Sequence, residues 1–401
     1  MKSIIFIESN TSGTGEIFIK KAIEYKYKPI LLTMNSNLYS FSNKILDLKI
    51  VDGIDTLNEQ EIVNFCKTYI AGGNVISGIT SSSEYYIEIA AKIAKIFGLA
   101  GPKPEAVPRC RNKYLQYKTL VNHNLDLPKT QIISKESDIL NGLKSMQFPV
   151  VIKPVEGTGS VGVRLCYNID QCCSLVEQLL THKKNERGIE VDNRVLLEEY
   201  IPGDEYSGEV FDGELIGITK KYLSTPPFFI ERGHEFPAIL DHKHYSQIKR
   251  EISRAIKALG LEWGACHVEF RLFEDRVYFI EVNPRLAGGY IPEIVKLSTG
   301  IDLIDNQLKK ALNMTVNIKR NKNINIGLRF LIPAHEGVLL NFSNMFQADG
   351  IIEVKQYKTE GLHFLPRGDF RDRVGHIIFN MDVISAEEIE QSISSIKIIK
   401  E

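Results

Sequence analysis

The chain has 401 residues, of which 43% are hydrophobic and 25% are charged. This length exceeds what one hydrophobic core usually supports, so the sequence predicts two or three domains. The 49 basic and 50 acidic side chains nearly cancel, which argues against nucleic acid or an anionic membrane as a partner. The cysteines are scattered without a CxxC pair, the apolar start is too short for a signal peptide, and no window approaches the roughly 20 apolar residues of a membrane span. These features indicate a cytoplasmic protein with reduced thiols.

The first hundred residues alternate short apolar runs with helical stretches. This alternation predicts a parallel sheet with crossover helices, an α/β domain. The strands are expected at 3–9, 28–34 and 74–79, and the helices at 16–27 and 84–99. The turn at 9–15 matches the dinucleotide-binding fingerprint poorly, because the third glycine would fall at Phe18. We interpret it as a sharp strand-to-helix turn, with a substrate-facing loop as the alternative.

The rest of the chain changes character twice. A segment rich in proline and glycine closes the first domain near residue 104, and a helix beginning around Asn112 opens the next. From Val150 the chain turns to strands and glycine loops, which is typical of an α+β domain. The last part has several short strands and one C-terminal helix, which predict a lid or a supporting β-rich subdomain. The expected domains are 1–104, 105–314 and 315–401.

Two predicted strands near residue 275 carry a cluster of polar side chains. Glu269 lies five residues before the tight turn at 274–275 and Glu281 six residues after it, so a hairpin brings the two carboxylates together. Along the second strand Glu281, Asn283 and Arg285 share one face. Hard oxygen ligands and a cation suit Mg²⁺, or Mn²⁺, with a nucleotide. The alternative is a solvated hairpin, which the flanking apolar residues disfavour because unpaired carboxylates in a buried sheet are expensive.

A glycine loop follows a buried strand that carries Lys153. Such a loop can place backbone N–H groups over phosphates, because glycine leaves room for the approach and tolerates positive φ. The lysine precedes the glycines, so this is not the P-loop motif, and the loop is expected to join two antiparallel strands. A flexible turn is the alternative, and Lys153 favours the phosphate cover. The loop residues are Gly157, Thr158, Gly159, Ser160 and Gly162.

An apolar strand ending in two acids lies between the glycine loop and the hairpin. An adenine ring needs a backbone carbonyl and an N–H at a strand end, which Glu198, Glu199 and Ile201 would provide. The ribose hydroxyls need a carboxylate a few residues later, and Glu205 fits. A solvated strand end is the alternative for these acids. Their place between the two other motifs favours a nucleotide site.

These blocks, in this order, resemble the ATP-grasp superfamily of carboxylate–amine ligases over nearly the whole chain. The resemblance implies a Rossmann-like N-terminal domain, a central ATP-grasp domain and a C-terminal part. It implies that Lys113 and Lys153 contact the phosphates of ATP, and that the loop at 156–162 is a mobile cover. It places Glu198, Ile201 and Glu205 at adenine and ribose. It also implies the remaining roles, with Glu269, Glu281 and Asn283 as Mg²⁺ ligands and Arg285 as the residue that stabilises a tetrahedral intermediate.

Within this superfamily, residues 79–102 and 231–238 are similar to bacterial L-amino-acid ligases, which make dipeptides. The resemblance implies that Glu84, Glu231 and His234 line the substrate pocket. Two structural alternatives remain, a first-turn acid of a helix for Glu84 and a structural histidine for His234. Several of these ligases carry a bulky residue near the arginine, whereas here Gly288 and Gly289 occupy that place, so a larger substrate side chain is expected.

The resulting prediction is an ADP-forming ligase that joins the carboxylate of an amino acid to an amine through an acylphosphate. Small-molecule amino acids would be its substrates, His234 or Glu231 would be candidate proton acceptors, and a homodimer would fit the family. Three alternatives remain: a bicarbonate-activating ligase, a purine-pathway ligase, and a regulatory protein that binds ATP without catalysis. ADP release with bicarbonate, with a ribonucleotide substrate, or with neither would distinguish them.

Overall fold

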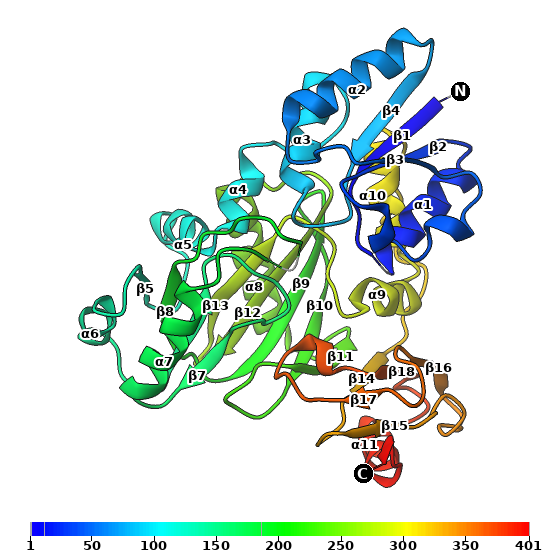
Figure 1. The fold of residues 1–401 in the computed structure, drawn as a ribbon. Coiled ribbons are helices and arrows are strands. Elements are labelled where there is room, and N and C mark those ends of the chain that lie inside the picture. Colours follow the sequence, from blue (N-terminus) through cyan, green and yellow to red (C-terminus); the bar gives the residue numbers. More distant parts are fainter. Residues whose placement is uncertain (1, 12, 186, 401) are drawn as a thin grey trace.

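The computed structural model describes residues 2–11, 13–185 and 187–400. Figure 1 shows three regions along the chain: a parallel sheet with helices at the N-terminus, a large central region, and a smaller C-terminal region of short strands. The predicted mixture of α/β and α+β architecture is confirmed. No helix in these ranges is long and apolar enough to cross a membrane.

The N-terminal sheet has the strand order β3-β2-β1-β4, and its strands are parallel, as predicted. Alternate residues of β1 point to opposite faces. Ile5 and Ile7 pack with α2 and α3, whereas Ile4 and Phe6 pack with α1 and with α10 from much later in the chain. The strands are β1 (Lys2–Ile7), β2 (Lys28–Thr33), β3 (Lys49–Asp52) and β4 (Val75–Thr80), and the helices are α1 (Thr14–Glu24), α2 (Glu59–Ala71), α3 (Ile87–Ile96) and α10 (Leu303–Ala311).

The contact between α1 and α10 joins the N-terminal sheet to the centre of the molecule. Lys21 on α1 lies 3.2 Å from Asp305 on α10, and Leu308 is completely buried in the same cluster as Phe6. Helix α10 follows α9 (Ile291–Thr299), which begins shortly after the predicted metal hairpin. Helices α9 and α10 thus connect the end of the hairpin to the N-terminal sheet.

A small antiparallel sheet of order β5-β8-β6-β7 carries the predicted glycine loop between β6 and β7. Asn112 caps the helix predicted there, since its side chain accepts hydrogen bonds from Tyr114 N and Leu115 N. The strands are β5 (Thr130–Ile133), β6 (Val150–Pro154), β7 (Arg164–Cys166) and β8 (Val195–Glu199), and the neighbouring helices are α4 (Ala106–Arg111), α5 (Lys113–Asn122), α6 (Asp138–Leu143) and α7 (Ile169–Leu180).

An eight-stranded sheet of order β13-β12-β9-β10-β11-β14-β18-β16 forms the platform of the molecule. Helix α8 (His242–Leu259) packs against it through buried residues such as Ile252 and Ile256. The sheet continues past residue 315, the expected boundary of the last domain; the division into three domains remains a prediction. The strands are β9 (Asp204–Phe211), β10 (Glu214–Leu223), β11 (Glu231–Phe236), β12 (Ala265–Phe273), β13 (Arg276–Asn283), β14 (Ile326–Leu331), β16 (Ile351–Gln356) and β18 (Gly375–Asn380).

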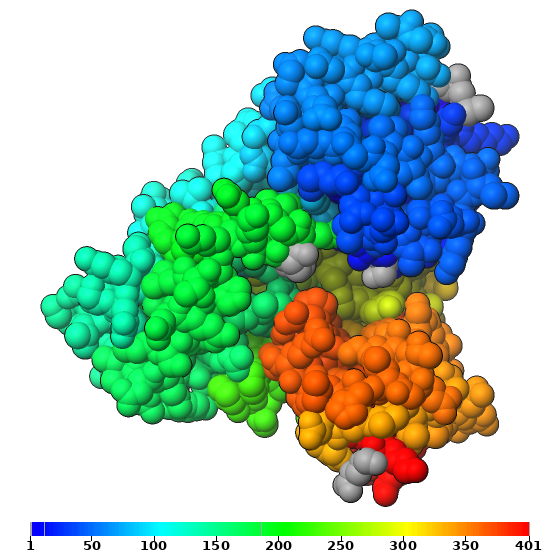
Figure 2. Space-filling model, viewed as in Figure 1, coloured from blue at the N-terminus to red at the C-terminus, as the bar shows by residue number. Residues whose placement is uncertain are grey.

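The C-terminal region adds a small sheet of order β17-β15-β19 and the predicted terminal helix. Figure 2 shows this region, in orange and red, approaching the blue N-terminal part and the green central part on one face. Its remaining elements are β15 (Gly337–Leu339), β17 (His363–Phe364), the short 3-10 helix η3 (Phe370–Asp372), α11 (Ala386–Ser395) and β19 (Ile399–Lys400). Two further 3-10 helices lie in the N-terminal part, η1 (Ser36–Leu38) and η2 (Ser42–Lys44).

Candidate active site

The predicted hairpin is present as β12 and β13. Its two turn residues, Glu274 and Asp275, have φ of 48° and 59°, the left-handed conformation that two-residue hairpin turns require. Glu269 lies directly opposite Glu281, and a bulge follows Glu269. Asn283 lies opposite His267 in the next row of the same face. The predicted pairing of the two carboxylates is confirmed.

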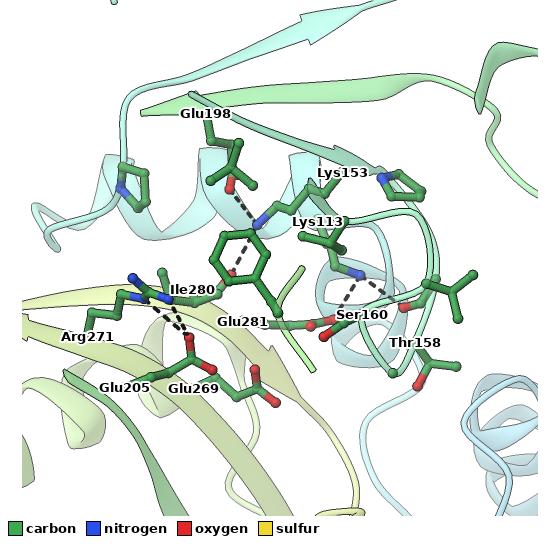
Figure 3. A pocket seen from close by; sticks show the side chains of 18 of the residues that line it. Lys113, Lys153, Thr158, Ser160, Glu198, Glu205, Glu269, Arg271, Ile280 and Glu281 are labelled. Carbon is green, nitrogen blue, oxygen red and sulfur yellow. Dashed lines mark hydrogen bonds and ion pairs between the residues drawn. The ribbon is translucent and has the colours of Figure 1, made fainter. Parts of the chain in front are cut away.

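The two predicted phosphate-binding lysines each hold an acid of the site (Figure 3). Lys153 Nζ on β6 lies 2.7 Å from Glu198 Oε2 on β8. Lys113 Nζ, at the start of α5, lies 3.0 Å from Glu281 Oε1 and donates to the carbonyl oxygen of Gly157 at 3.0 Å. Lys113 thus links the metal hairpin to the glycine loop.

The glycine loop covers the space above these lysines. Gly159, Ser160 and Gly162 have φ of 62°, 60° and 74°, so the predicted need for positive φ is confirmed. A Cβ built on Gly159 would lie 2.5 Å from Cδ1 of Phe370 in η3. The C-terminal region therefore packs directly on the loop.

A first cavity lies beneath the loop and is lined by the predicted ATP-binding residues with the exception of Gly162. Glu205 accepts hydrogen bonds from Arg271 Nη2 at 3.1 Å, and the carbonyl oxygen of Ile201 accepts one from Arg271 Nη1 at 2.8 Å. Arg271 was not predicted, although it continues the alternation of His267 and Glu269 along β12. The cavity is lined by residues that include Lys113, Lys153, Gly157, Thr158, Gly159, Ser160, Glu198, Glu199, Ile201, Glu205, Glu269, Glu281, Asn283 and Arg285.

Lys221 on β10 is a second residue that sequence reasoning missed. Its ammonium group lies 2.9 Å from Glu205, 3.1 Å from Glu231 and 3.2 Å from Glu269, and its side chain is only 2% exposed. Burial opposes a charge here, but the three carboxylates outweigh burial and raise the pKa of Lys221 well above its usual value. Lys221 thereby joins the predicted ribose, substrate and metal residues in one ionic network.

His267, on β12, contacts the proposed metal ligand Glu269 and orients its carboxylate. Its Nδ1 lies 3.1 Å from Glu209 and its Nε2 lies 3.0 Å from Glu269. Burial would lower the pKa of His267, yet Glu209 and then Glu269 raise it to about 9, so the ring is an imidazolium that donates at both nitrogens. Glu269 is correspondingly held ionised, because Lys221 and His267 outweigh burial and lower its pKa.

Arg285 and Glu84 come together from distant parts of the chain. Arg285 Nη2 lies 2.6 Å from Glu84 Oε2. Helix α3 begins at Ile87, later than predicted, so Glu84 lies in the preceding turn and is not a first-turn acid. Burial opposes both charges, but Arg285 together with Arg111 and Lys113 lowers the pKa of Glu84, and Glu84 together with Glu281 and Glu269 raises the pKa of Arg285.

A second cavity of about 550 Å³ opens beside the first and is bounded by all three regions of the chain. Asn10, Gly13 and Thr14 from the predicted turn at 9–15 line it, which favours the substrate-facing alternative for this loop; residue 12 lies outside the described residues. The volume is typical of small-molecule sites. The residues that line both cavities are Thr158, Gly159, Ser160, Phe229, Glu231, Glu269 and Arg285.

The remaining predicted substrate residues meet around Glu231. Arg373 Nη2 lies 2.6 Å from Glu231 Oε2, an interaction that sequence reasoning missed. His234 is completely buried and lies behind Gly289, where an added Cβ would be 2.7 Å from its Nε2. It does not line the second cavity, so its predicted place in the pocket lining is wrong. Gly289 thus permits a close approach to His234, whereas nothing lies within 4 Å of a Cβ at Gly288. Of these two glycines, Gly288 is therefore the one with open space beside it.

The oxygen donors of the hairpin suit a magnesium ion. Across residues 2–11, 13–185 and 187–400, no group of three His, Cys, Asp or Glu side chains could hold a metal. The donors on β12 and β13 are two carboxylates, Glu269 and Glu281, and the amide of Asn283. Mg²⁺ commonly takes one or two carboxylates and completes its shell with phosphate oxygens and water, so this donor set fits Mg²⁺ bound together with a nucleotide.

Comparison with known proteins agrees with the class of enzyme that this fold and site define, the ATP-dependent carboxylate–amine ligases. The family model described as "ATP-grasp domain" matches residues 146–293, which contain the glycine loop and the hairpin. The chain belongs to the ATP-grasp family.

Individual relatives extend the likeness beyond that domain. The protein y4rH of Sinorhizobium fredii is 31% identical over 94% of this chain and 78% of its own length. The alanine–anticapsin ligase of Bacillus amyloliquefaciens is 25% identical over 61% of this chain, and the match spans 56% of that enzyme. The crystal structure of an L-amino acid ligase from Bacillus licheniformis superposes with a TM-score of 0.79 at 23% identity, covering 98% of this chain and 96% of that one.

Proposed function

We propose that this protein uses ATP to join the carboxylate of an amino acid to an amine, most simply that of a second amino acid. The observation that carries the proposal is the position of Arg285, which lines both the nucleotide cavity and the second cavity. A phosphoryl group and a substrate carboxylate would meet where the two cavities join. The names of the alanine–anticapsin ligase and of the L-amino acid ligase support amino acids as the substrate class.

The reaction would proceed in two steps. In the first, a carboxylate oxygen of the substrate attacks the γ-phosphorus of ATP, the bond from that phosphorus to the β,γ-bridging oxygen breaks, and ADP leaves. When ATP binds, Lys113 and Lys153 would exchange their carboxylate partners for phosphate oxygens. The product of this step is an acylphosphate.

In the second step, the amine nitrogen attacks the acylphosphate carbon and phosphate leaves with the electrons of the C–O bond. The attacking amine loses its proton to solvent or to the departing phosphate. Arg285 would stabilise the oxyanion of the tetrahedral intermediate, with its guanidinium oriented by Glu84. Closure of the glycine loop would keep water from the acylphosphate.

Magnesium would complete this site. Glu269, Glu281 and Asn283 would hold the ion, and it would neutralise charge on the phosphates when bound. Lys221 and His267 keep Glu269 charged and oriented. The assignment of these ligands and of the ATP-binding residues is part of the proposal.

The test is a matrix of amino acid pairs with ATP and Mg²⁺, monitored for ADP release and followed by mass measurement of the products. The proposal expects ADP release that requires both amino acids and a product of their summed masses less one water. ADP release driven by bicarbonate or by an aminated ribonucleotide, with none from amino acid pairs, would contradict it. Nucleotide binding without turnover on any of these substrates would indicate a regulatory protein.

A further inference from the structure

Among the described residues that line the second cavity, one acid forms no ion pair. The other carboxylates of this cavity lie within 3.2 Å of a cation: Glu84 beside Arg285, Glu231 beside Arg373, and Glu269 beside Lys221. Glu293 also lines this cavity. Within the part of the chain that the structure describes, its side chain makes neither an ion pair nor a hydrogen bond with another residue.

The position of Glu293 in its helix does not explain this arrangement. An acid in the first turn of α9 interacts favourably with the helix dipole. An exposed acid at the same position would make this interaction equally well. Burial raises the pKa of Glu293; Lys355 opposes the increase, whereas Asp302 and Glu353 add to it. Lys355 acts on this carboxylate but forms no ion pair with it among the described residues, and a cation from a ligand would pair with it directly.

Glu293 does not line the nucleotide cavity. Arg285, Glu231 and Glu269 line both cavities, whereas Glu293 lines only the second. Between Arg285 and Glu293 the chain passes through Gly288, where an added Cβ would meet nothing within 4 Å. The free space at Gly288 leaves room for a substrate side chain that extends from a carboxylate at Arg285 toward Glu293.

We propose that the second cavity binds an amino acid with a cationic side chain, such as lysine, ornithine or arginine, and that Glu293 pairs with that cation. This inference rests on the proposed ligase function and adds the substrate class. Glu293 is then a specificity-determining residue, since it contacts the substrate remote from the bond that forms.

Lysine and norleucine provide the test, because they share a chain of four side-chain carbons and differ in the terminal ammonium. Each is paired with a panel of second amino acids, and the ratio of kcat/KM for lysine to that for norleucine is measured. The wild-type protein should prefer lysine, and Glu293→Gln should lower the ratio about tenfold or more, the order expected for loss of one hydrogen bond to a charged group.

Glu353→Gln is the matched control. Glu353 lies on nearby β16, its side chain is 47% exposed, and it does not line the cavity. This change should alter the ratio by less than about twofold, as expected for an exposed charge. A wild-type preference for norleucine, or an equal effect of Glu293→Gln on both substrates, would overturn the inference; an equal effect would assign Glu293 to the α-ammonium group.

Binding measured without turnover separates this inference from the ligase proposal. Trp263 is the single tryptophan of the chain and lines the second cavity, so its fluorescence can report a bound amino acid. If no amino acid pair releases ADP, the ligase proposal fails. The inference still stands if lysine changes the fluorescence, norleucine does not, and Glu293→Gln abolishes the change; it fails if lysine and norleucine behave alike.

Discussion

The ammonium of Lys221 lies 3.2 Å from the carboxylate of Glu269, although their strands, β10 and β12, are separated by β9 in the sheet. The contact spans β9 because Lys221, Glu205 and Arg271 form one row across three strands, and Glu269 lies in the adjacent row. Both rows project from the same face of the sheet. The residues proposed for ribose, substrate and metal binding are thus held by a single buried cation.

Replacing Lys221 by methionine should therefore damage both stability and activity. The change removes the buried cation that Glu205, Glu231 and Glu269 share, and breaking a buried ion pair commonly costs about 3 to 5 kcal/mol. We expect a comparable decrease in the free energy of unfolding, measured by urea denaturation, and loss of ADP release. Lys220→Met, which affects the neighbouring and more exposed lysine, is the control. A Lys221→Met protein with wild-type stability would show that the network contributes little.

Glu281→Gln tests the proposed metal site while keeping the shape of the side chain. Loss of one anionic ligand should abolish ADP release at ordinary Mg²⁺ concentrations, because the amide oxygen binds the ion more weakly than a carboxylate. Glu274→Gln changes an exposed acid in the turn of the same hairpin and should retain activity. Near-normal turnover of Glu281→Gln over a Mg²⁺ titration would exclude Glu281 as a required ligand.

The hairpin could be predicted from the sequence because its geometry is local. A two-residue turn and the period of two along each strand determine which residues lie opposite one another. Glu269 and Glu281 are separated by twelve positions, so no other part of the chain is needed to bring them together. The glycine loop was predictable for the same reason, since positive φ is a property of single residues such as Gly159.

Lys221, Arg373 and Glu293 could not be assigned in this way. The place of Lys221 depends on the pairing of β10 with β9 and of β9 with β12, and no local pattern specifies the register of strands so far apart in sequence. Arg373 reaches Glu231 across 142 positions. The absence of an ion pair at Glu293 among the described residues is a property of the whole cavity, and the position of Glu293 in a first turn favours the ordinary helix-dipole interpretation.

Gly159→Ala should impair ATP binding through two separate effects. A side chain at φ of 62° is strained, and the added Cβ would lie 2.5 Å from the Phe370 ring. We expect KM for ATP to rise about tenfold, since strain of this kind costs on the order of 1 to 3 kcal/mol. Gly157→Ala, whose Cβ would meet nothing closer than 3.9 Å, should have a smaller effect. Combining Gly159→Ala with Phe370→Ala should lower KM for ATP part of the way back to the wild-type value. If KM does not decrease in the double variant, the Phe370 ring moves aside freely and contributes nothing to the effect of Gly159→Ala.

His234 should make the stability of the protein depend on pH between neutrality and mild acid. The ring is completely buried and neither nitrogen has a hydrogen-bond partner among the described residues. Burial lowers the pKa of His234 to about 3, although Glu231 opposes the decrease, whereas the pKa in an unfolded chain is about 6.5. The folded state therefore stays neutral while the unfolded state gains a proton, and stability falls as the pH decreases below 6.5.

His234→Gln measures this effect, because glutamine does not titrate. For the wild type, the histidine alone should cost about 2 kcal/mol of unfolding free energy at pH 5 relative to pH 7.5. Urea denaturation at the two pH values should show a decrease that is smaller by this amount in the variant. His182→Gln, at an exposed position on the surface, should lose as much stability as the wild type. If His234→Gln loses as much stability as the wild type, the His234 ring must be protonated in the folded state. The nearest group that would stabilise the protonated ring is Glu231, 3.7 Å away. The assignment of His234 as a neutral residue behind Gly289 would then be wrong.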